Sequence, residues 1–257
     1  MKQSVAALFS LSDKKAIITG AGGGLGKEIA AGLLEAGADI VLIDSSSHLE
    51  DTASELALLG GSVFTVRGNL ADSIERENLF NKAVHKLGGT LDILVNCAGI
   101  QRRNPSEIFS LEDWQAVIDI NLTAVFSLCQ LAGRIMLDKG EGKIINMASM
   151  LSFFGGLTVP AYAASKGGVA QLTKALSNEW ASRGINVNAI APGYMATEMN
   201  TALIHDADRN EKILARIPAH RWGEPEDLKG IAIFLSSAAS DYVNGSVIPV
   251  DGGYLGY

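Results

Sequence analysis

The sequence predicts a doubly wound α/β fold, in which a seven-stranded parallel sheet carries helices on both faces. Three observations lead to this prediction. Seven short runs rich in Ile and Val recur along the chain without polar alternation, as expected for strands buried on both faces. Longer amphipathic segments lie between these runs, and strands that alternate with helices form right-handed βαβ crossovers. A glycine-rich turn also joins the first strand to the first helix.

The predicted elements follow one another through the whole chain. Strands are expected at residues 16–19, 40–43, 62–66, 93–95, 143–147, 186–190 and 246–250. Helices are expected at residues 25–36, 48–59, 74–87, 111–137, 161–183 and 225–236. Because no linker, low-complexity tract or internal repeat interrupts the alternation, residues 1–257 are predicted to form a single dinucleotide-binding domain.

One long segment, residues 193–222, breaks the alternation between the sixth and seventh strands. It has helical patterns but no strand pattern. An insertion after the carboxyl end of a strand lies where open α/β sheets bind their ligands. We therefore expect this segment to be a lid over the substrate, the alternative being a plain surface excursion.

The composition excludes several classes of protein. The formal net charge is −7 and no basic block is present, so nucleic acid is not an expected partner. The histidines and cysteines show no metal-ligand spacing, and Cys97 and Cys129 lie in apolar stretches typical of buried thiols. Since no signal-peptide pattern and no continuous apolar run of about 18 residues is found, we expect a cytoplasmic protein without a membrane span or a metal.

The glycine-rich turn occupies residues 19–26. Its glycines Gly20, Gly24 and Gly26 depart from the G-x-G-x-x-G spacing of dinucleotide-binding Rossmann folds, because Leu25 stands at the sixth position. The physical requirements are still met: a tight turn, backbone N–H groups that can approach a pyrophosphate, and a helix N-terminus that favours negative charge. We therefore predict a dinucleotide here, the alternative being a merely tight turn.

Asp44 ends the second predicted strand. An acidic residue at this place accepts hydrogen bonds from the adenosine ribose hydroxyls, whereas a 2′-phosphate would meet its negative charge. The serines at 45–47 that follow offer no arginine to receive a phosphate. The expected cofactor is therefore NAD rather than NADP, and the alternative for Asp44 is an ordinary helix cap.

Tyr162 and Lys166 open a long predicted helix, and their spacing of four residues places both side chains on one face. A free tyrosine is a poor base at neutral pH. A nearby ammonium group and an oxidised nicotinamide favour the phenolate, so Tyr162 becomes a usable proton acceptor for an alcohol that loses hydride. Ser149 ends the fifth strand, where its hydroxyl can bond the reacting oxygen, the alternative being a capping or turn serine.

Two further groups are weaker signals by themselves. Asn121 lies in the apolar helical pattern at 111–137. An amide there can interrupt the backbone hydrogen bonds of the helix and hold a water; the alternative is a buried amide whose hydrogen bonds are satisfied within the protein. Asn96, Ala98 and Gly99 follow the fourth strand, where small residues let the backbone approach a cofactor or form an ordinary turn.

Together these residues resemble the short-chain dehydrogenase/reductase family over essentially the full chain. The resemblance lies in the turn at 19–26, Asn96-x-Ala98-Gly99, Asn121, Ser149, Tyr162-x3-Lys166, and Pro192-Gly193 with Thr197. It implies that Tyr162 is the catalytic acid/base, Ser149 positions the carbonyl or alcohol, Lys166 lowers the pKa of the tyrosine and holds the ribose, and Asn121 anchors a proton-relay water. The cofactor contacts that it implies come from Gly20, Gly24, Leu25, Gly26, Asp44, Asn69, Leu70, Asn96, Ala98, Gly99, Tyr162, Lys166, Pro192, Gly193 and Thr197. Two positions depart from the family pattern, Asn69 in place of a common aspartate and Cys97 in place of a common asparagine.

A narrower resemblance concerns the substrate. The stretches 99–103, 143–162, 189–197, 216–223 and 240–253 are similar to the 2-deoxy-D-gluconate 3-dehydrogenases, a group also described as 2-dehydro-3-deoxy-D-gluconate 5-dehydrogenases. This implies an NAD-dependent oxidoreductase that transfers hydride between a nicotinamide and a secondary alcohol or ketone of a sugar acid. The family also implies a homotetramer. The apolar residues in 111–137, 161–180 and 254–257 are candidate contact surfaces, the alternative being that they belong to the intramolecular core.

Other functions are weighed against this one. A 3-oxoacyl-carrier-protein reductase of the same family usually takes NADPH, which Asp44 disfavours, and a polyol dehydrogenase remains open. A dinucleotide sensor without turnover typically lacks the tyrosine or the lysine, and this chain has both.

A sugar acid brings a carboxylate, which needs a cationic partner when it is buried. Arg102 and Arg103 follow the turn after the fourth strand and are the predicted substrate-binding residues, together with Ser149. Arginine suits this role because its planar fork binds a carboxylate bidentately. The sequence leaves open which of the two points inward, and whether both are solvated loop residues. Arg216 and Arg221, near the end of the lid, are weaker candidates.

Overall fold

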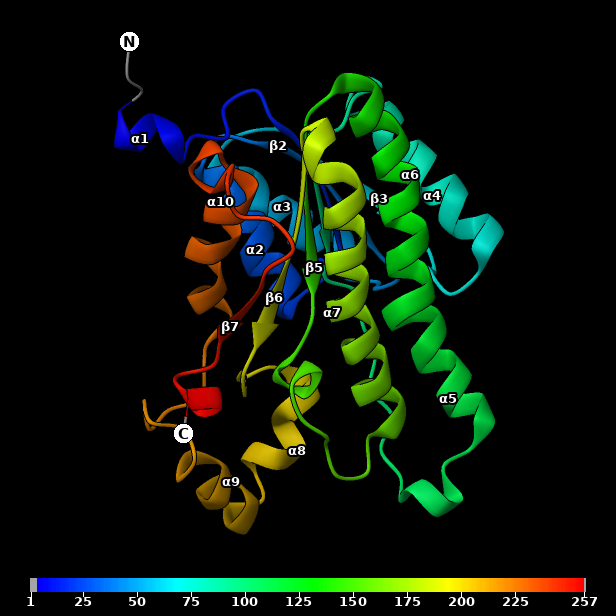
Figure 1. The fold of residues 1–257 in the computed structure, drawn as a ribbon, viewed down its shortest axis with the longest axis vertical. Coiled ribbons are helices and arrows are strands. Elements are labelled where there is room, and N and C mark those ends of the chain that lie inside the picture. The colour runs from blue at the N-terminus through cyan, green and yellow to red at the C-terminus, as the bar shows by residue number, and fades with distance from the viewer. Residues whose placement is uncertain (1–3, 257) are drawn as a thin grey trace.

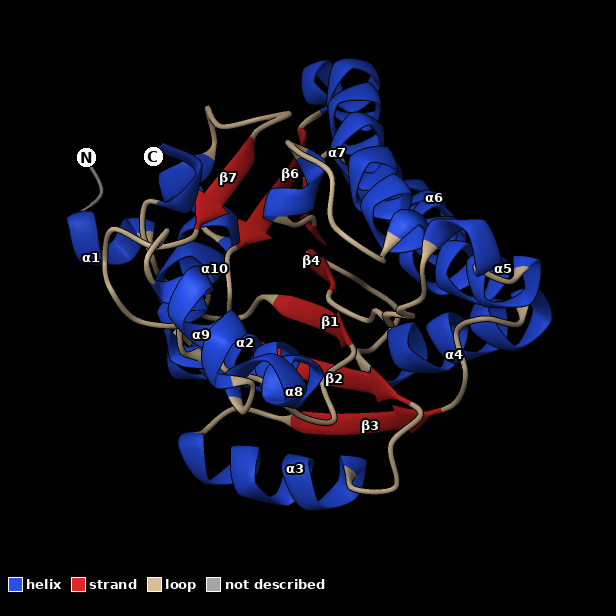
Figure 2. Ribbon diagram, turned by 90° about the horizontal axis from the view of Figure 1, so that it is seen from below, coloured by secondary structure: helices blue, strands red, loops and turns tan. Residues whose placement is uncertain are grey.

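The computed structural model describes residues 4–256, and their strands form one seven-stranded parallel sheet in the order β3-β2-β1-β4-β5-β6-β7 (Figures 1 and 2). The strands are β1 (Lys15–Thr19), β2 (Asp39–Asp44), β3 (Val63–Arg67), β4 (Ile93–Asn96), β5 (Gly142–Met147), β6 (Ile185–Pro192) and β7 (Val247–Val250). Each strand overlaps its predicted range, and the predicted fold class is confirmed.

The helices fill the intervals between the strands. They are α1 (Val5–Leu8), α2 (Gly24–Glu35), α3 (Leu49–Leu56), α4 (Ser73–Lys86), α5 (Leu111–Ile118), α6 (Ala124–Lys139), α7 (Pro160–Trp180), α8 (Thr201–Ile204), α9 (Ala207–Leu214) and α10 (Lys229–Ser236). Three predicted helices are partly 3₁₀ at one end: 57–59 after α3, 181–183 after α7, and 225–228 before α10. The short helix α1 was not anticipated from the sequence.

Alternate residues of each strand face opposite layers of helices, as the pleat of a strand requires. On one face, Ile17 and Leu94 join the core under α4, α6 and α7. On the other face, Ile18 and Val95 join the core under α2, α3 and α10. Figure 2 shows these two layers on either side of the sheet. Covering on both faces explains why the central strands carry Ile and Val at successive positions.

Residues 111–139 form one continuous helical segment of 29 residues, which contains α5 and α6. Its most apolar window has a mean hydropathy of 1.5, and half of that window is buried inside the protein. By length and composition alone it passes as a membrane span, although the sequence has no unbroken apolar run of that length. Because Val117 is fully buried, and Leu128 and Met136 belong to the core that packs on one face of the sheet, the segment is explained as a core helix.

The order of the strands places the ligand site. The chain runs outward from β1 to β3 on one side and from β4 to β7 on the other, so β1 and β4 are neighbours at the point where the direction reverses. In open α/β sheets a crevice forms there, at the carboxyl ends of the strands. The predicted lid contains α8 and α9, which lie beyond the carboxyl end of β6 at the bottom of Figure 1.

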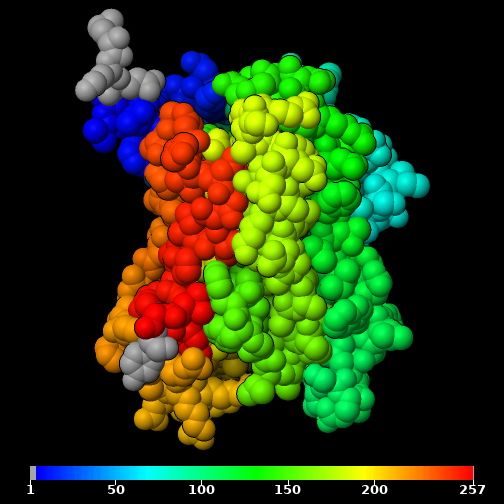
Figure 3. Space-filling model, in the orientation of Figure 1, coloured from blue at the N-terminus to red at the C-terminus, as the bar shows by residue number. Residues whose placement is uncertain are grey.

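The carboxyl-terminal segment packs on the same end of the molecule. Tyr254 is only 4% exposed and packs with Met150 and Ile217, on the loop after β5 and in the lid. Figure 3 shows the last residues, in red, between the lid in orange and the loop after β5 in green. Tyr254 was expected at a contact between subunits, but within the described residues it belongs to the core of its own chain. Tyr257 lies outside the described residues.

Candidate active site

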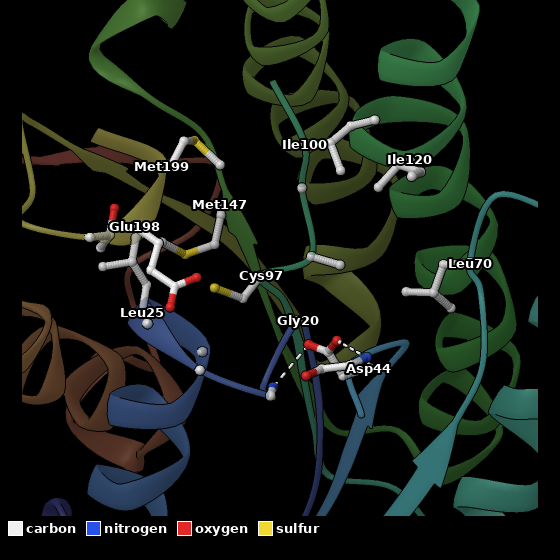
Figure 4. Close-up of a pocket in the computed structure, with 18 of the residues that line it drawn as sticks. Gly20, Leu25, Asp44, Leu70, Cys97, Ile100, Ile120, Met147, Glu198 and Met199 are labelled. Atoms are coloured by element: carbon white, nitrogen blue, oxygen red, sulfur yellow. Dashed lines mark hydrogen bonds between the residues drawn. The ribbon is translucent and has the colours of Figure 1, made fainter. Parts of the chain in front are cut away.

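A cavity of about 540 Å³ opens at the carboxyl ends of the central strands (Figure 4). Most of the predicted cofactor residues line it, namely Gly20, Gly24, Leu25, Gly26, Asp44, Asn69, Leu70, Ala98, Gly99, Tyr162, Lys166, Pro192, Gly193 and Thr197. Ser149 lines it as well. Residues from seven separate segments of the chain therefore meet in one place, at the crevice that the topology predicts.

The glycine-rich turn has the shape of a phosphate cradle. Gly20 has a φ of +67°, and a Cβ there would lie 2.6 Å from the backbone of Ala98. A Cβ on Gly26 would lie 2.1 Å from the carbonyl oxygen of Gly20. At Gly23 and Gly24, by contrast, a Cβ would meet no atom within 4 Å. The turn is thus closed on the protein side and open where α2 begins, which fits a pyrophosphate at the helix N-terminus.

Asp44 lies at the adenosine end of this cradle. Its carboxylate accepts hydrogen bonds from the backbone N–H groups of Gly22 (2.9 Å) and Ser46 (2.8 Å), which are drawn in Figure 4. These two bonds fix the carboxylate against the turn and leave its remaining acceptor positions for ribose hydroxyls. The geometry suits the role predicted for Asp44.

An arginine that the sequence reading missed lies beside Asp44. Arg67 is the register partner of Asp44 on the neighbouring strand β3, and its Nε donates to the carbonyl oxygen of Ser45 at 3.4 Å. The expectation of NAD used only the residues that follow Asp44 along the chain, and none of these is an arginine. The signal that would have found Arg67 is its place at the end of the next predicted strand, since the ends of parallel neighbours meet at the same edge of a sheet.

Two departures from the family pattern have local explanations. The side-chain oxygen of Asn69 accepts a hydrogen bond from the backbone of Ala71 at 3.0 Å, which an aspartate oxygen would also do. Cys97 lines the cavity, and burial raises the pKa of its thiol to about 12. A thiol with so high a pKa remains protonated and serves as a small apolar contact rather than a nucleophile.

Asn96 is the one predicted cofactor residue that lies below the cavity instead of lining it. It is 2% exposed, and its side-chain amide donates to Asn146 at 2.9 Å and to the Cys129 sulfur at 3.3 Å. Asn146 donates in turn to Thr173 on α7 at 3.0 Å. This buried network ties β4 and β5 to the helix that carries the catalytic pair, so Asn96 supports the site from beneath.

Tyr162 and Lys166 share one face of α7, as their spacing predicts. The Lys166 ammonium lies 5.5 Å from the centre of the Tyr162 ring and donates to the carbonyl oxygen of Met147 at 2.6 Å. Burial lowers the pKa of Lys166 to about 8 and raises the pKa of Tyr162 to about 12. A hydrogen bond from Ser149 and the charge of Arg103 act in the opposite direction and lower the pKa of Tyr162. At neutral pH the phenol is therefore protonated and ready to donate.

Ser149 caps the 3₁₀ turn Met150–Ser152 that follows β5. Its Oγ accepts a hydrogen bond from the backbone of Leu151 at 3.1 Å, so its own proton is free to be donated. With Ser149 and Tyr162 in the same cavity, two hydroxyl groups can act on one reacting oxygen.

Asn121 lies in a turn of π-helix, Asp119–Thr123, that separates α5 from α6. The amide is fully buried; its oxygen accepts from the Ile100 N–H, and its nitrogen donates to the Ile100 carbonyl, each at 2.9 Å. It also donates to Ser165, which precedes Lys166, at 3.3 Å. The helix is thus broken locally around this amide, which joins the loop after β4 to the catalytic helix.

The four candidate arginines have different surroundings. Arg221 forms two bonds to Asp227, at 2.6 and 2.9 Å, and Arg216 lies 4.3 Å from the centre of the Tyr254 ring. Arg102 lies 3.3 Å from Asp113 and is exposed. These three have partners elsewhere, and Arg103, which is also exposed, is the candidate whose charge acts on Tyr162.

The charge of Arg103 acts on the catalytic tyrosine, although the Arg103 side chain is exposed and does not line the cavity. Its pKa is lowered by partial burial and by the charge of Arg209 in the lid, whereas Tyr194 and Tyr162 raise it. The loop that carries it is tied to the loop after β5, because the N–H of Asn104 donates to the carbonyl of Thr158 at 3.0 Å. Arg103 is therefore the candidate arginine whose positive charge favours the phenolate form of Tyr162.

Aromatic residues that were not predicted as site residues pack together beside the lid. Tyr194 makes edge contacts with Trp222 and Tyr254, at 5.4 and 5.5 Å between ring centres, and Tyr254 stacks on Phe154. These residues come from the loop after β5, both ends of the lid, and the C-terminus. No sequence signal joins them, because their proximity arises only from the tertiary fold.

Comparisons with known proteins show which families and proteins the chain resembles. A sequence model of the short chain dehydrogenases matches residues 14–208. The chain is 50% identical over 248 residues to the 2-dehydro-3-deoxy-D-gluconate 5-dehydrogenase of Bacillus subtilis (strain 168), which covers 96% of each chain. It is 40% identical over 250 residues to the gluconate 5-dehydrogenase of Gluconobacter oxydans (strain 621H), again 96% of each chain. A crystal structure of a gluconate 5-dehydrogenase from Burkholderia cenocepacia J2315, in complex with NADP and tartrate, is 41% identical, has a TM-score of 0.94, and spans 99% of this chain and 100% of that one.

Proposed function

The chain belongs to the short-chain dehydrogenase family, and on that premise we propose that it is an NAD-linked sugar-acid dehydrogenase. The reaction is hydride transfer between a nicotinamide and a secondary alcohol or ketone of a 2-deoxy-D-gluconate or 2-dehydro-3-deoxy-D-gluconate type of acid. The observation that carries this proposal is the charge of Arg103, an exposed cation that lowers the pKa of Tyr162 and is available to an acidic substrate. The sugar-acid names of the relatives support the same substrate class.

Each residue of the site has a separate role in the reaction. A bound nicotinamide supplies or accepts the hydride. Tyr162 donates a proton to the oxygen of a ketone during reduction, and takes the proton of the hydroxyl during oxidation. Ser149 donates a hydrogen bond to the same oxygen and stabilises its negative charge. The Lys166 ammonium keeps a positive charge near the phenol, and Arg103 holds the substrate carboxylate.

Initial rates with a small panel of compounds test this proposal. Purified enzyme is assayed for NADH formation with 2-deoxy-D-gluconate, gluconate, a neutral polyol and a 3-hydroxyacyl thioester. We expect the highest kcat/KM with a sugar acid. If the polyol or the thioester is preferred, the carboxylate role of Arg103 and the substrate class are both wrong.

The cofactor preference depends on two residues of opposite charge. Asp44 disfavours a 2′-phosphate, and it supports NAD. Arg67 beside Ser45 favours NADP, and the relative from Burkholderia binds NADP. We propose that Asp44 dominates, because its carboxylate lines the cavity whereas Arg67 is exposed outside it.

We predict that NAD is preferred over NADP by at least about tenfold in kcat/KM, since a like-charge contact readily costs about 1.4 kcal/mol. Asp44→Asn keeps the size of the side chain and removes the charge, so NADP use is expected to rise about tenfold. Arg67→Gln serves as the matched variant and is expected to lower NADP use while NAD use stays the same. Equal use of the two cofactors by the unmodified enzyme would show that the role given to Asp44 is wrong.

The pH dependence follows from the raised pKa of Tyr162. Oxidation needs the phenolate, whose population below the pKa grows about tenfold per pH unit, so the oxidation rate is expected to rise with pH. Reduction needs the phenol and is expected to stay level across neutral pH. Arg103 lowers the pKa of Tyr162, so Arg103→Ala raises that pKa and moves the oxidation profile to higher pH. Profiles of kcat/KM for both enzymes measure this, and a shift to lower pH would contradict it.

We also infer that the protein is a cytoplasmic homotetramer. The helices expected at the contacts carry exposed apolar side chains, with Leu111 83% and Phe126 46% exposed. The two cysteines are not joined in a disulfide, as is usual in reducing compartments. Light scattering of the purified protein gives the mass of the assembly directly.

A further inference from the structure

The hydroxyl of Ser152 connects the two halves of the catalytic site. It accepts a hydrogen bond from the backbone N–H of Ser149 at 3.3 Å, and it donates to the carbonyl oxygen of Lys166 at 2.7 Å. Ser149 and Lys166 lie on different elements, the turn after β5 and the helix α7. A single side chain therefore joins the backbones of two residues that act on the same reacting oxygen and its proton donor.

The turn that contains Ser149 is also shaped by its own hydrogen bonds. Its turn is one of 3₁₀ helix, with Ser149 as cap and Ser152 as the residue that closes the capping box. Inside the turn, Leu151 donates to Ser149 Oγ at 3.1 Å and the Ser152 N–H donates to the Ser149 carbonyl at 2.9 Å. These bonds shape the turn but do not hold it against α7. The bond from Ser152 to Lys166 joins this turn to that helix, in addition to the hydrogen bond between the Ser149 hydroxyl and Tyr162.

We propose that Ser152 is a positioning residue, which sets the distance between the Ser149 hydroxyl and the Tyr162 phenol by tying the turn to α7. Tyr162 lies one helical turn before Lys166, so a displacement of the turn against α7 changes that distance directly. Small displacements of catalytic groups have large effects on rate, because the reaction needs reacting atoms within hydrogen-bonding reach. This proposal rests on one part of the function proposed above, namely that Tyr162 and Ser149 act together on the reacting oxygen. It does not depend on which substrate is used.

Its test is a pair of substitutions at this position. Ser152→Ala removes both hydrogen bonds and is expected to lower kcat by about tenfold or more. The dissociation constant for NADH should be unchanged, because the phosphate turn and Asp44 are untouched. The oxidation profile should also move to higher pH, because Tyr162 loses a well-placed hydrogen bond from Ser149. Ser152→Thr keeps the hydroxyl, and since the side chain is only partly buried its added methyl group has room. We expect this variant to recover most of the rate.

The chain offers a matched control in Ser54, whose hydroxyl also donates to a helix carbonyl, that of Glu50, at 2.9 Å on the exposed surface of α3. Ser54→Ala should leave kcat and the pH profile unchanged. The proposal is overturned if Ser152→Ala keeps its kcat, if its pH profile does not move, or if Ser152→Thr fails to restore the rate. The kcat of each variant is divided by the kcat of the unmodified enzyme, both measured with the substrate that the unmodified enzyme prefers. If that substrate is a polyol, the sugar-acid proposal is wrong, but the role of Ser152 is still tested.

Discussion

Tyr162→Phe is expected to lower kcat by at least about 10², the usual loss when a general acid or base is removed. The substitution deletes one oxygen atom and leaves the ring in its place beside Lys166. No other hydroxyl is placed to take over, because Ser149 has a much higher intrinsic pKa and its role is to donate a hydrogen bond. Steady-state rates in both directions measure the loss.

Binding of the dinucleotide should survive this substitution. The glycine-rich turn and the Asp44 carboxylate, which hold the two ends of the expected cofactor site, are unchanged. NADH fluorescence titration measures the dissociation constant, and Tyr242→Phe, at a fully exposed tyrosine, is the matched control. Near-normal turnover by Tyr162→Phe would mean that the assigned acid/base chemistry is wrong.

Arg103→Ala is expected to raise KM for a sugar acid by about 10- to 100-fold, the range for a lost hydrogen bond to a charged group. A neutral polyol makes no bond to this guanidinium, so its KM should change little. Part of any loss in kcat at neutral pH arises through Tyr162, whose pKa rises without the arginine. The kcat measured with the polyol gives the loss that arises through Tyr162, because oxidation of the polyol needs the same proton transfer but involves no carboxylate.

The neighbouring arginine provides the control. Arg102 has almost the same place in the sequence but pairs with Asp113 on α5 at 3.3 Å. Arg102→Ala should therefore change KM for the acid by less than about twofold, as expected for an exposed ion pair. If both variants keep the KM of the unmodified enzyme for the acid, the carboxylate is not bound by either arginine, and the result favours a polyol dehydrogenase.

The parts of the site that could be predicted from sequence are those with a local cause. The glycines at 20 and 26 are needed by the turn itself, since any Cβ there meets backbone atoms. Tyr162 and Lys166 share a face because they lie on one helix. The strand and helix ranges follow from burial on both faces of the sheet, which the runs of Ile and Val report directly.

The parts that could not be predicted depend on contacts between distant segments. Arg67 reaches Ser45 because β2 and β3 are in register, which no spacing along the chain reveals. The choice between Arg102 and Arg103 is decided by Asp113, on a separate helix. Ser152 has no signal in the sequence, because only the tertiary fold places its hydroxyl at the carbonyl of Lys166.

The most direct test of the central claim follows a deuterium atom. A keto sugar acid is reduced with NADH that carries deuterium at the transferred position of the nicotinamide, and the product is examined by mass spectrometry and NMR. We expect a hydroxy sugar acid with a single deuterium on the newly formed carbinol carbon, and no such product from Tyr162→Phe on the same time scale. A product without deuterium, or NADH consumption without a reduced sugar acid, would contradict hydride transfer at this site.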